Sequence, residues 1–324
     1  MELVNGDRGV SSSRIVCLGE AMVELTPRQG RWDVHYGGDT LNVALHLTRL
    51  GFDIAYLTAL GSDPFAGPMR QAWGREGMDV SLVLTEPGRT TGLYSIATDE
   101  NGERTFAYWR GESAARRLFH AEGIEPALAA AREADLLFFS LTSLAILPGE
   151  GREAVLALAR EVRGRGGKVA FDGNYRPRLW PDAATARVWR DRAAAVATFG
   201  LPSLEDEMRL DASESAETIR EHWLTWGCAE VVVKAGADGI VLPDGTLAPP
   251  EARLHALDTS GAGDAFDAGY LGARLRGLTP ERAAAHGQRL AAWTVMRHGA
   301  IPERDHAAPY AAMAAESTQG ARPA

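Results

Sequence analysis

Short apolar runs alternate along this chain with longer segments in which apolar residues recur at helical spacing. The apolar runs predict buried strands at residues 14–18, 54–60, 136–140, 168–172, 195–199 and 230–234. The segments between them predict amphipathic helices, among them residues 67–77, 151–164 and 215–226. Strands that alternate with helices indicate an α/β fold, with a mostly parallel central sheet and helices on both faces.

Two segments, at about residues 22–36 and 91–110, interrupt this alternation with β-like patterns. Turn-forming residues divide them at 27–30 and 99–102, and the second segment predicts a hairpin. Together the segments predict a small β-sheet that acts as a lid, closing over a site and excluding water. An edge sheet that serves only dimer contacts is the alternative, and both roles can coexist.

The length and the composition fit a soluble enzyme. A chain of 324 residues with 45% hydrophobic residues can bury a large core. One α/β domain with a small appendage fits this length as well as two domains do. We expect a single domain over residues 14–315, with the two lid segments inserted. The polar or small residues at 1–13 and 316–324 predict frayed tails.

Charge and cysteine content exclude several other classes of protein. A formal net charge of −9 argues against a general role on nucleic acid or on a membrane surface. The two cysteines, Cys17 and Cys228, form no CxxC pair, so neither a disulfide scaffold nor a zinc site is indicated. No apolar stretch is long enough to span a bilayer, and the first thirteen residues lack a signal-peptide core. We therefore expect a cytoplasmic protein.

The most informative motif is a run with two closely spaced glycines before a predicted helix at 264–276. The run reads Asp258-Thr259-Ser260-Gly261-Ala262-Gly263-Asp264-Ala265-Phe266. Glycine lets the backbone approach a ligand, and a helix N-terminus offers unpaired N–H groups, so the turn predicts a phosphate site. Asp264 would repel a phosphate, but it fits as a base that takes the proton of a hydroxyl attacking phosphorus. The alternative is an acidic residue that only charges the first helical turn.

A second glycine motif lies upstream and precedes an amphipathic pattern that Gly51 ends. This motif reads Gly37-Gly38-Asp39-Thr40-Leu41-Asn42-Val43-Ala44. The glycine pair places bare backbone beside a ligand, and Asn42 offers both a donor and an acceptor, which suits a sugar rich in hydroxyls. Taken alone, the motif fits a tight strand-to-helix turn with an asparagine cap better than it fits a binding site.

Two arginines bear on the nature of the substrate. Asp172, Asn174 and Arg176 alternate after a predicted strand, so in an extended segment they point to one side. Arg110 ends a predicted lid strand. A forked guanidinium can hold a carboxylate or a phosphate, and two arginines that face one cleft indicate an acidic sugar. Surface salt bridges are the alternative for both.

The two glycine motifs resemble the signatures of the ribokinase-like (PfkB) family of sugar kinases, with residues 37–44 similar to the first and 258–266 to the second. The resemblance implies a ribokinase-like fold and phosphoryl transfer from ATP with Mg²⁺. It implies that Gly261, Ala262 and Gly263 form the anion hole and that Asp264 is the catalytic base.

Within this family, several runs are similar to the bacterial kinases of 2-keto-3-deoxygluconate, over about residues 15–302. The most specific of them is Asn174-Tyr175-Arg176-Pro177-Arg178-Leu179-Trp180. This similarity implies sugar-acid contacts at Gly38, Asp39, Thr40, Leu41, Asn42, Tyr94, Tyr108, Trp109, Arg110, Arg176 and Asp264. It implies nucleotide contacts at Asn174, Arg176, Lys234, Ala235, Gly236, Ala237, Asp238, Gly239, Gln288 and the four residues Gly261, Ala262, Gly263 and Asp264.

The chain departs from the family pattern at a few positions. Leu204 replaces an asparagine of a metal-associated Asn-x-x-Glu element that retains Glu207, so the resemblance implies at most an indirect metal contact there. Gln288 stands where asparagine is common near adenine, and Ala300 stands where some of these kinases have aspartate.

We therefore expect phosphorylation of the 6-hydroxyl of 2-keto-3-deoxygluconate by ATP, in a protein that forms a homo-oligomer, with a dimer through the lid sheet as one form. A kinase of another sugar, such as fructose or 5-keto-2-deoxygluconate, would keep both motifs and change the arginines. A non-catalytic sugar-acid sensor on the same fold would have no need of Asp264.

Overall fold

The computed structural model describes residues 13–28, 30–98, 104–212 and 215–316. A seven-stranded parallel sheet forms its centre, as the sequence predicts, in the order β11-β10-β9-β8-β1-β4-β5. Its strands are β1 Arg14–Leu18, β4 Asp53–Leu60, β5 Val83–Thr85, β8 Leu136–Ser140, β9 Lys168–Asp172, β10 Phe199–Gly200 and β11 Glu230–Val231.

Two of the predicted strands differ from the structure. The strand predicted at 195–199 begins only at Phe199, because Ala195 is the C-cap of helix α6. The strand predicted at 230–234 divides at Val232, and β12 Val233–Lys234 joins a different sheet. That second sheet is antiparallel and also contains β13 Ile240–Val241 and β14 Leu247–Ala248.

Helices cover both faces of the central sheet because successive residues of each buried strand point to opposite sides. Ile15 and Cys17 of β1 pack in one cluster, whereas Val16 and Leu18 pack in the other. The first cluster takes residues from α1 Asp39–Arg49, α2 Ala66–Glu76, α9 Ala262–Leu275, α10 Pro280–Val295 and α11 Tyr310–Ala315. The second takes residues from α3 Ile124–Ala131, α4 Leu141–Ile146, α5 Gly149–Gly164, α6 Ala183–Ala194, α7 Leu204–Asp211 and α8 Ala216–Trp226.

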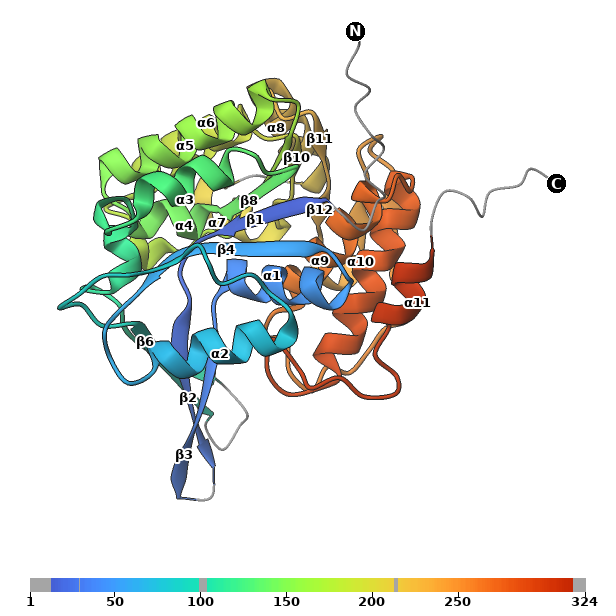
Figure 1. Ribbon diagram of the computed structural model, residues 1–324. Coiled ribbons are helices and arrows are strands. Elements are labelled where there is room, and N and C mark those ends of the chain that lie inside the picture. The colour runs from blue at the N-terminus through green and yellow to red at the C-terminus, as the bar shows by residue number, and fades with distance from the viewer. Residues whose placement is uncertain (1–12, 29, 99–103, 213–214, 317–324) are drawn as a thin grey trace, which may run out of the picture.

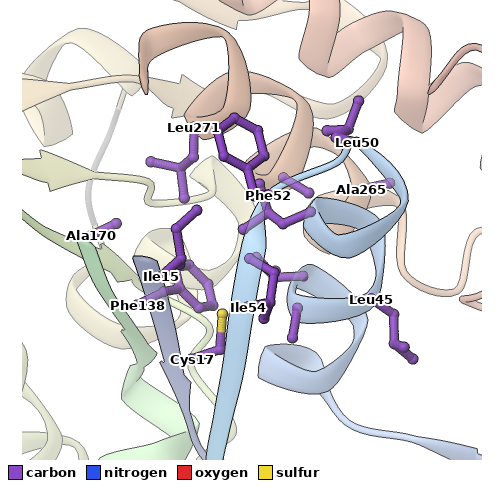
Figure 2. Close-up of a cluster of buried hydrophobic side chains, with 14 of the residues drawn as sticks. Ile15, Cys17, Leu45, Leu50, Phe52, Ile54, Phe138, Ala170, Ala265 and Leu271 are labelled. Carbon is purple, nitrogen blue, oxygen red and sulfur yellow. The ribbon is translucent and has the colours of Figure 1, made fainter. Parts of the chain in front are cut away.

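These two helical layers are visible on either side of the sheet in Figure 1. Figure 2 shows how Leu45 of α1 and Leu271 of α9 lie on the same side of the sheet as Ile54 and Phe138. Short 3-10 helices complete the fold at η2 Ala114–His120, η3 Pro177–Leu179 and η4 Gly236–Asp238. Within the described ranges, no helix combines the length and the apolar character that a membrane span requires.

The two predicted lid segments form one four-stranded sheet, in the order β3-β2-β6-β7. Its strands are β2 Met22–Arg28, β3 Arg31–Gly37, β6 Gly92–Thr98 and β7 Arg104–Trp109. Strands β2 and β6 are parallel, and each is paired with its own hairpin partner. Figure 1 shows the β2–β3 hairpin projecting from the body of the molecule. The turn predicted at 99–102 lies outside the described residues, and closure of this sheet over a site stays a prediction.

The last described residue, Glu316, contacts helix α10. Glu316, which the sequence places in a frayed tail, pairs with Arg282, His286 and Arg289 of α10. The hydrogen bond from His286, with the two arginines beside it, lowers the pKa of Glu316 to about 2. These partners lie about thirty residues earlier in the chain, and fraying of the predicted tails stays a prediction. The other residues of both predicted tails, apart from Ser13, lie outside the described chain.

Candidate active site

The two glycine motifs, far apart in the sequence, meet at the N-terminal ends of α1 and α9. Asn42 in the first turn of α1 donates a hydrogen bond from Nδ2 to Oδ2 of Asp264 in the first turn of α9, at 2.7 Å. The Oδ1 atom of Asn42 is buried and has no hydrogen-bond partner within the described chain. A buried acceptor without a partner is costly, so this atom indicates that a donor from a bound ligand completes the site.

Both turns need glycine for steric reasons. Gly38 has φ of 146°, and a Cβ atom there would lie 2.3 Å from the carbonyl oxygen of Glu20. Gly261 has φ of 70°, and a Cβ atom there would lie 2.6 Å from the Cβ of Ala300. Any other side chain would strain the backbone at both positions. The glycines therefore let α1 and α9 begin close to neighbouring chain segments, and α9 begins two residues earlier than the predicted helix at 264–276.

The surroundings of Asp264 favour its protonated form. Burial, together with the negative charge of Asp39, raises the pKa of the Asp264 carboxyl to about 7. The hydrogen bond from Asn42 opposes this rise, because it stabilises the ionised form. A carboxylate whose pKa lies near neutrality is suited to accept a proton and to release it again. The geometry therefore fits a general base.

Asp39 is held by hydrogen bonds from three sides. Its Oδ2 accepts from Ser140 Oγ at 2.6 Å and from Asn174 Nδ2 at 2.7 Å. Its Oδ1 accepts from the backbone N–H of Thr40 at 2.9 Å. The structure thus brings together Asp39 and Asn174, which the sequence assigns to the sugar and the nucleotide respectively. Their contacts with those ligands stay predictions.

Lys234, which the sequence assigns to the nucleotide loop, points towards two carboxylates. Its Nζ donates to Asp172 Oδ1 at 3.0 Å and to the two carboxylate oxygens of Asp267 at 2.9 and 3.0 Å. The sequence analysis did not single out Asp267. Its signal was its spacing, because a residue three positions after Asp264 lies on the same helical face.

Three of the predicted sugar contacts on the lid lie together. The hydroxyl of Tyr94 donates to a carboxylate oxygen of Glu24, and the ring of Tyr108 stacks on that of Tyr94 at 5.8 Å between centroids. The guanidinium of Arg110 lies 5.9 Å from the centroid of the Tyr108 ring. Trp109 does not join this group, because adjacent strand residues point to opposite faces, and its side chain is 60% exposed.

Glu20 is a site residue that the sequence analysis missed. It is buried immediately after β1, forms an ion pair with Arg110, and accepts a hydrogen bond from Ser113 Oγ. The available signal was a charged residue directly after an apolar strand, where parallel sheets gather ligand-binding groups. Arg110 is therefore a buried, paired cation rather than a solvated one.

The remaining candidates lie in more exposed or already paired positions. Arg176 is half exposed and pairs with Asp206 at 3.2 Å, and the surrounding carboxylates raise the pKa of its guanidinium although burial opposes this. Gln288 Nε2 donates to the carbonyl of Ala248 at 3.1 Å. The turn 235–239 contains η4 and exposes Gly236, Ala237 and Asp238.

Glu207 has both carboxylate oxygens engaged by protein groups. Arg190 Nη1 donates to one at 2.6 Å, and Trp223 Nε1 donates to the other at 3.1 Å. Burial raises the pKa of Glu207 to about 7, against the charge of Arg190. The described ranges contain no group of three or more His, Cys, Asp or Glu side chains that could hold a metal ion. An indirect metal role for Glu207 stays a prediction.

A parallel α/β core with a small projecting β-sheet, a glycine turn at a helix N-terminus and an adjacent aspartate is the arrangement of the ribokinase-like class of carbohydrate kinases. The model of the pfkB family carbohydrate kinases matches residues 12–307. The chain belongs to this family.

Two curated relatives match nearly the whole chain. It is 38% identical over 304 residues to the 2-dehydro-3-deoxygluconokinase of Escherichia coli (strain K12), which covers 91% of this chain and 98% of that protein. It is 35% identical over 302 residues to the 2-dehydro-3-deoxygluconokinase of Dickeya dadantii, covering 90% and 97%.

Two solved structures share the fold at modest identity. One is the aminoimidazole riboside kinase of Salmonella enterica, complexed with aminoimidazole riboside and an ATP analog, with a TM-score of 0.78 and 25% identity over 93% of this chain and 100% of that one. The other is the fructokinase of Vibrio cholerae in a form with bound fructose, ADP and calcium ion, with a TM-score of 0.77 and 27% identity over 90% and 95%.

The raised pKa of Asp264 makes the activity of this kinase depend on pH in a defined direction. If Asp264 is the base that the sequence predicts, it must be ionised to accept a proton, and kcat/KM should fall about tenfold per pH unit below a pKa of about 7 and level off above it. Initial rates across pH, with both substrates below saturation, test this. An acid limb near the ordinary aspartate pKa of about 4 would contradict it.

Proposed function

We propose that this protein transfers the γ-phosphoryl group of ATP to the 6-hydroxyl of 2-keto-3-deoxygluconate, also called 2-dehydro-3-deoxygluconate. The observation that carries the proposal is the Asp264 carboxylate, held by Asn42 in the first turn of α9 beside the Gly261 turn. The choice of substrate is supported by four curated 2-dehydro-3-deoxygluconokinases that are 33–38% identical over at least 90% of this chain.

In the proposed reaction, Asp264 accepts the proton of the sugar hydroxyl as that oxygen forms a bond to the γ-phosphorus. The bond between this phosphorus and the bridging oxygen of ATP breaks, and ADP leaves. The N–H groups at the start of α9, from Gly261 to Asp264, stabilise negative charge on the transferring group. Mg²⁺ bound with ATP neutralises charge on the phosphate oxygens. Asn42 keeps the base in place, and its free Oδ1 is available to a sugar hydroxyl.

The nucleotide side of the site rests on less direct support. The solved relatives complexed with an ATP analog or ADP share the fold over at least 90% of this chain. We place the phosphates beside Asn174 and Arg176, and the adenine between the 235–239 turn and Gln288. Because both oxygens of Glu207 are occupied, any contribution of this residue to a Mg²⁺ site is indirect.

Recognition of an acid rather than a neutral sugar is assigned to Arg110 and Arg176. Arg110 reaches the site from the lid and Arg176 from the segment after β9, so the two could bracket a carboxylate from different elements. A kinase of neutral sugars is the competing function, since a fructokinase of Salmonella typhimurium is 31% identical over 80% of this chain. A non-catalytic sensor is less consistent with the site, because a sensor would not need a base next to an anion hole.

A direct assay separates these functions. ADP release should be fastest with 2-keto-3-deoxygluconate and slower with fructose and 5-keto-2-deoxygluconate. Asp264→Asn should lower turnover by about 10²–10⁴ and leave ATP and sugar binding largely intact. Fructose as the best substrate would replace this proposal with the neutral-sugar function. Turnover of Asp264→Asn within a few-fold of the parent would show that another group takes the proton.

Substitution of the arginines tests acid recognition. Arg110→Leu or Arg176→Leu should lower kcat/KM for the sugar acid by about ten- to a hundredfold and affect fructose less, because a charge-assisted contact is lost. Arg209→Leu is a matched control, since Arg209 pairs with Glu205 on the surface of α7. Equal losses on acid and neutral sugars would assign the arginines a structural or phosphate-binding role.

The lid sheet can serve both closure and assembly. Tyr94 and Tyr108 lie on one face, and pairing through the sheet places Trp32, Val34 and Trp109 on the other. Each of these three side chains is more than half exposed, which supports a homo-oligomer that covers this second face.

The cytoplasmic location of the protein is also a proposal.

Lid closure predicts local protection on ligand binding. Hydrogen exchange in β6 and β7 should slow when the sugar acid and a nucleotide are added, whereas β9 should change little, because lids belong to the least stable parts of a structure. Mass spectrometry of peptides from both regions measures this. Unchanged hydrogen-exchange protection in β6 and β7 at saturating ligands would show that the sheet is a static edge sheet and does not close.

A further inference from the structure

A buried ionic triad lies directly behind the catalytic turn. The side chains of Lys234, Asp172 and Asp267 are 11%, 6% and 0% exposed, and the lysine Nζ lies within 3.0 Å of oxygens from both aspartates. The three residues come from β12, from the end of β9 and from α9, respectively. The ion pairs of the triad therefore connect the central sheet, the small antiparallel sheet and helix α9.

The triad is close enough to the anion hole to influence its charge. A Cβ atom at Gly263 would lie 3.7 Å from the Lys234 Nζ, so the ammonium lies against the backbone of that turn. Asp267 follows Asp264 by one helical turn, on the same face of α9. This chain has two lysines, Lys168 and Lys234. The flexible ammonium of lysine, with three donors, suits a point where two carboxylates must be reached at once.

We propose that Lys234, Asp172 and Asp267 are positioning residues that fix Asp264 and the Gly261–Gly263 turn and set the local charge that the catalytic carboxylate experiences. The inference rests on the proposed kinase function. It assigns Lys234 a role inside the protein, in addition to its place at the start of the nucleotide loop. The alternative is an ion network that stabilises the fold and leaves the chemistry of Asp264 unaffected.

The charges that face Asp264 come from several elements. Asp39 on α1 and Asp172 at the end of β9 raise its pKa, and Lys234 on β12 lowers it. Three further groups interact electrostatically with Asp264. They are Asp267 on the same helix, Tyr94 on the lid and Arg176 on the segment after β9. The cation of the triad and its two anions thus act on the pKa of Asp264 in opposite directions. Removing the cation should raise this pKa, and removing either anion should lower it.

The triad is expected to keep its lysine charged. Burial alone would lower the pKa of Lys234, but Asp172 and Asp267 outweigh it and raise this pKa above its ordinary value. Burial also raises the pKa values of both aspartates, against the attraction of the lysine. Lys234→Met leaves two buried carboxylates without their cation and should therefore lose stability, whereas Asp172→Asn and Asp267→Asn each leave one Lys–Asp pair.

The test compares the pH dependence of Asp264 in three variants. Loss of the cation in Lys234→Met should move the acid limb of kcat/KM upward by roughly one pH unit, the size expected for one nearby charge. Asp172→Asn and Asp267→Asn should move it downward. The titration of the Asp264 carboxyl, followed by ¹³C NMR in the free protein and assigned with Asp264→Asn, should shift in the same directions.

Arg274→Met is the matched control. Arg274 lies near the other end of α9 and forms an ion pair with Glu230 of β11, so its removal also costs a contact between this helix and the sheet. Arg274→Met should lower the thermal stability of the protein and leave the pH of the acid limb unchanged. If Lys234→Met is poorly folded, the double variant Lys234→Met/Asp267→Asn, which removes one charge of each sign, should fold better and return the limb towards that of the parent.

The results distinguish this proposal from the proposed function. If the parent protein phosphorylates a different sugar, the profiles are measured on that sugar, and the NMR titration requires no activity at all. Rate losses without opposite shifts of the Asp264 titration, or a shift of equal size in Arg274→Met, would overturn the positioning role and leave only a structural network.

Discussion

The contact between Asn42 and Asp264 is the interaction on which the site depends. It joins α1 to α9, the helix that begins at the Gly261 turn, and 222 positions separate the two residues. Each helix begins at a glycine that admits no larger side chain, so both N-termini can approach the same small volume. The parallel sheet supplies the rigid frame for this meeting, because its carboxyl ends carry Asp172 and Ser140 to the same edge.

The site gathers negative charge in a way that needs explanation. Asp39, Asp172, Asp264 and Asp267 lie close enough to influence one another, in a protein whose net charge is already −9. In water such a group would simply ionise, whereas in the protein each carboxylate is held by a specific donor. Asn42, Asn174, Ser140 and Lys234 supply these donors. The site thereby holds the pKa of one carboxylate, Asp264, near 7, and it is expected still to accept an anionic substrate.

The sequence allowed much of this site to be predicted because the essential signals are local. Each glycine motif lies within a few residues of the helix that it starts, and the second motif also contains Asp264. The alternation of apolar runs with helical patterns is enough to predict a parallel sheet. The strand predicted at 195–199 was displaced because alanine fits the end of a helix as well as a strand. Glu20 and Asp267 escaped notice because their importance comes from Arg110 and Lys234, which approach only in three dimensions.

The lid is joined to the catalytic machinery with almost no intervening chain. Strand β3 ends at Gly37 and α1 begins at Asp39, so Gly38 alone separates the four-stranded sheet from the helix that carries Asn42. If the sheet closes over the sugar as proposed, a sugar that leaves the sheet displaced would also displace the start of α1, and with it Asn42. Under the proposed mechanism, such a sugar would misalign Asp264 after binding, and discrimination between sugars would appear in turnover more than in affinity.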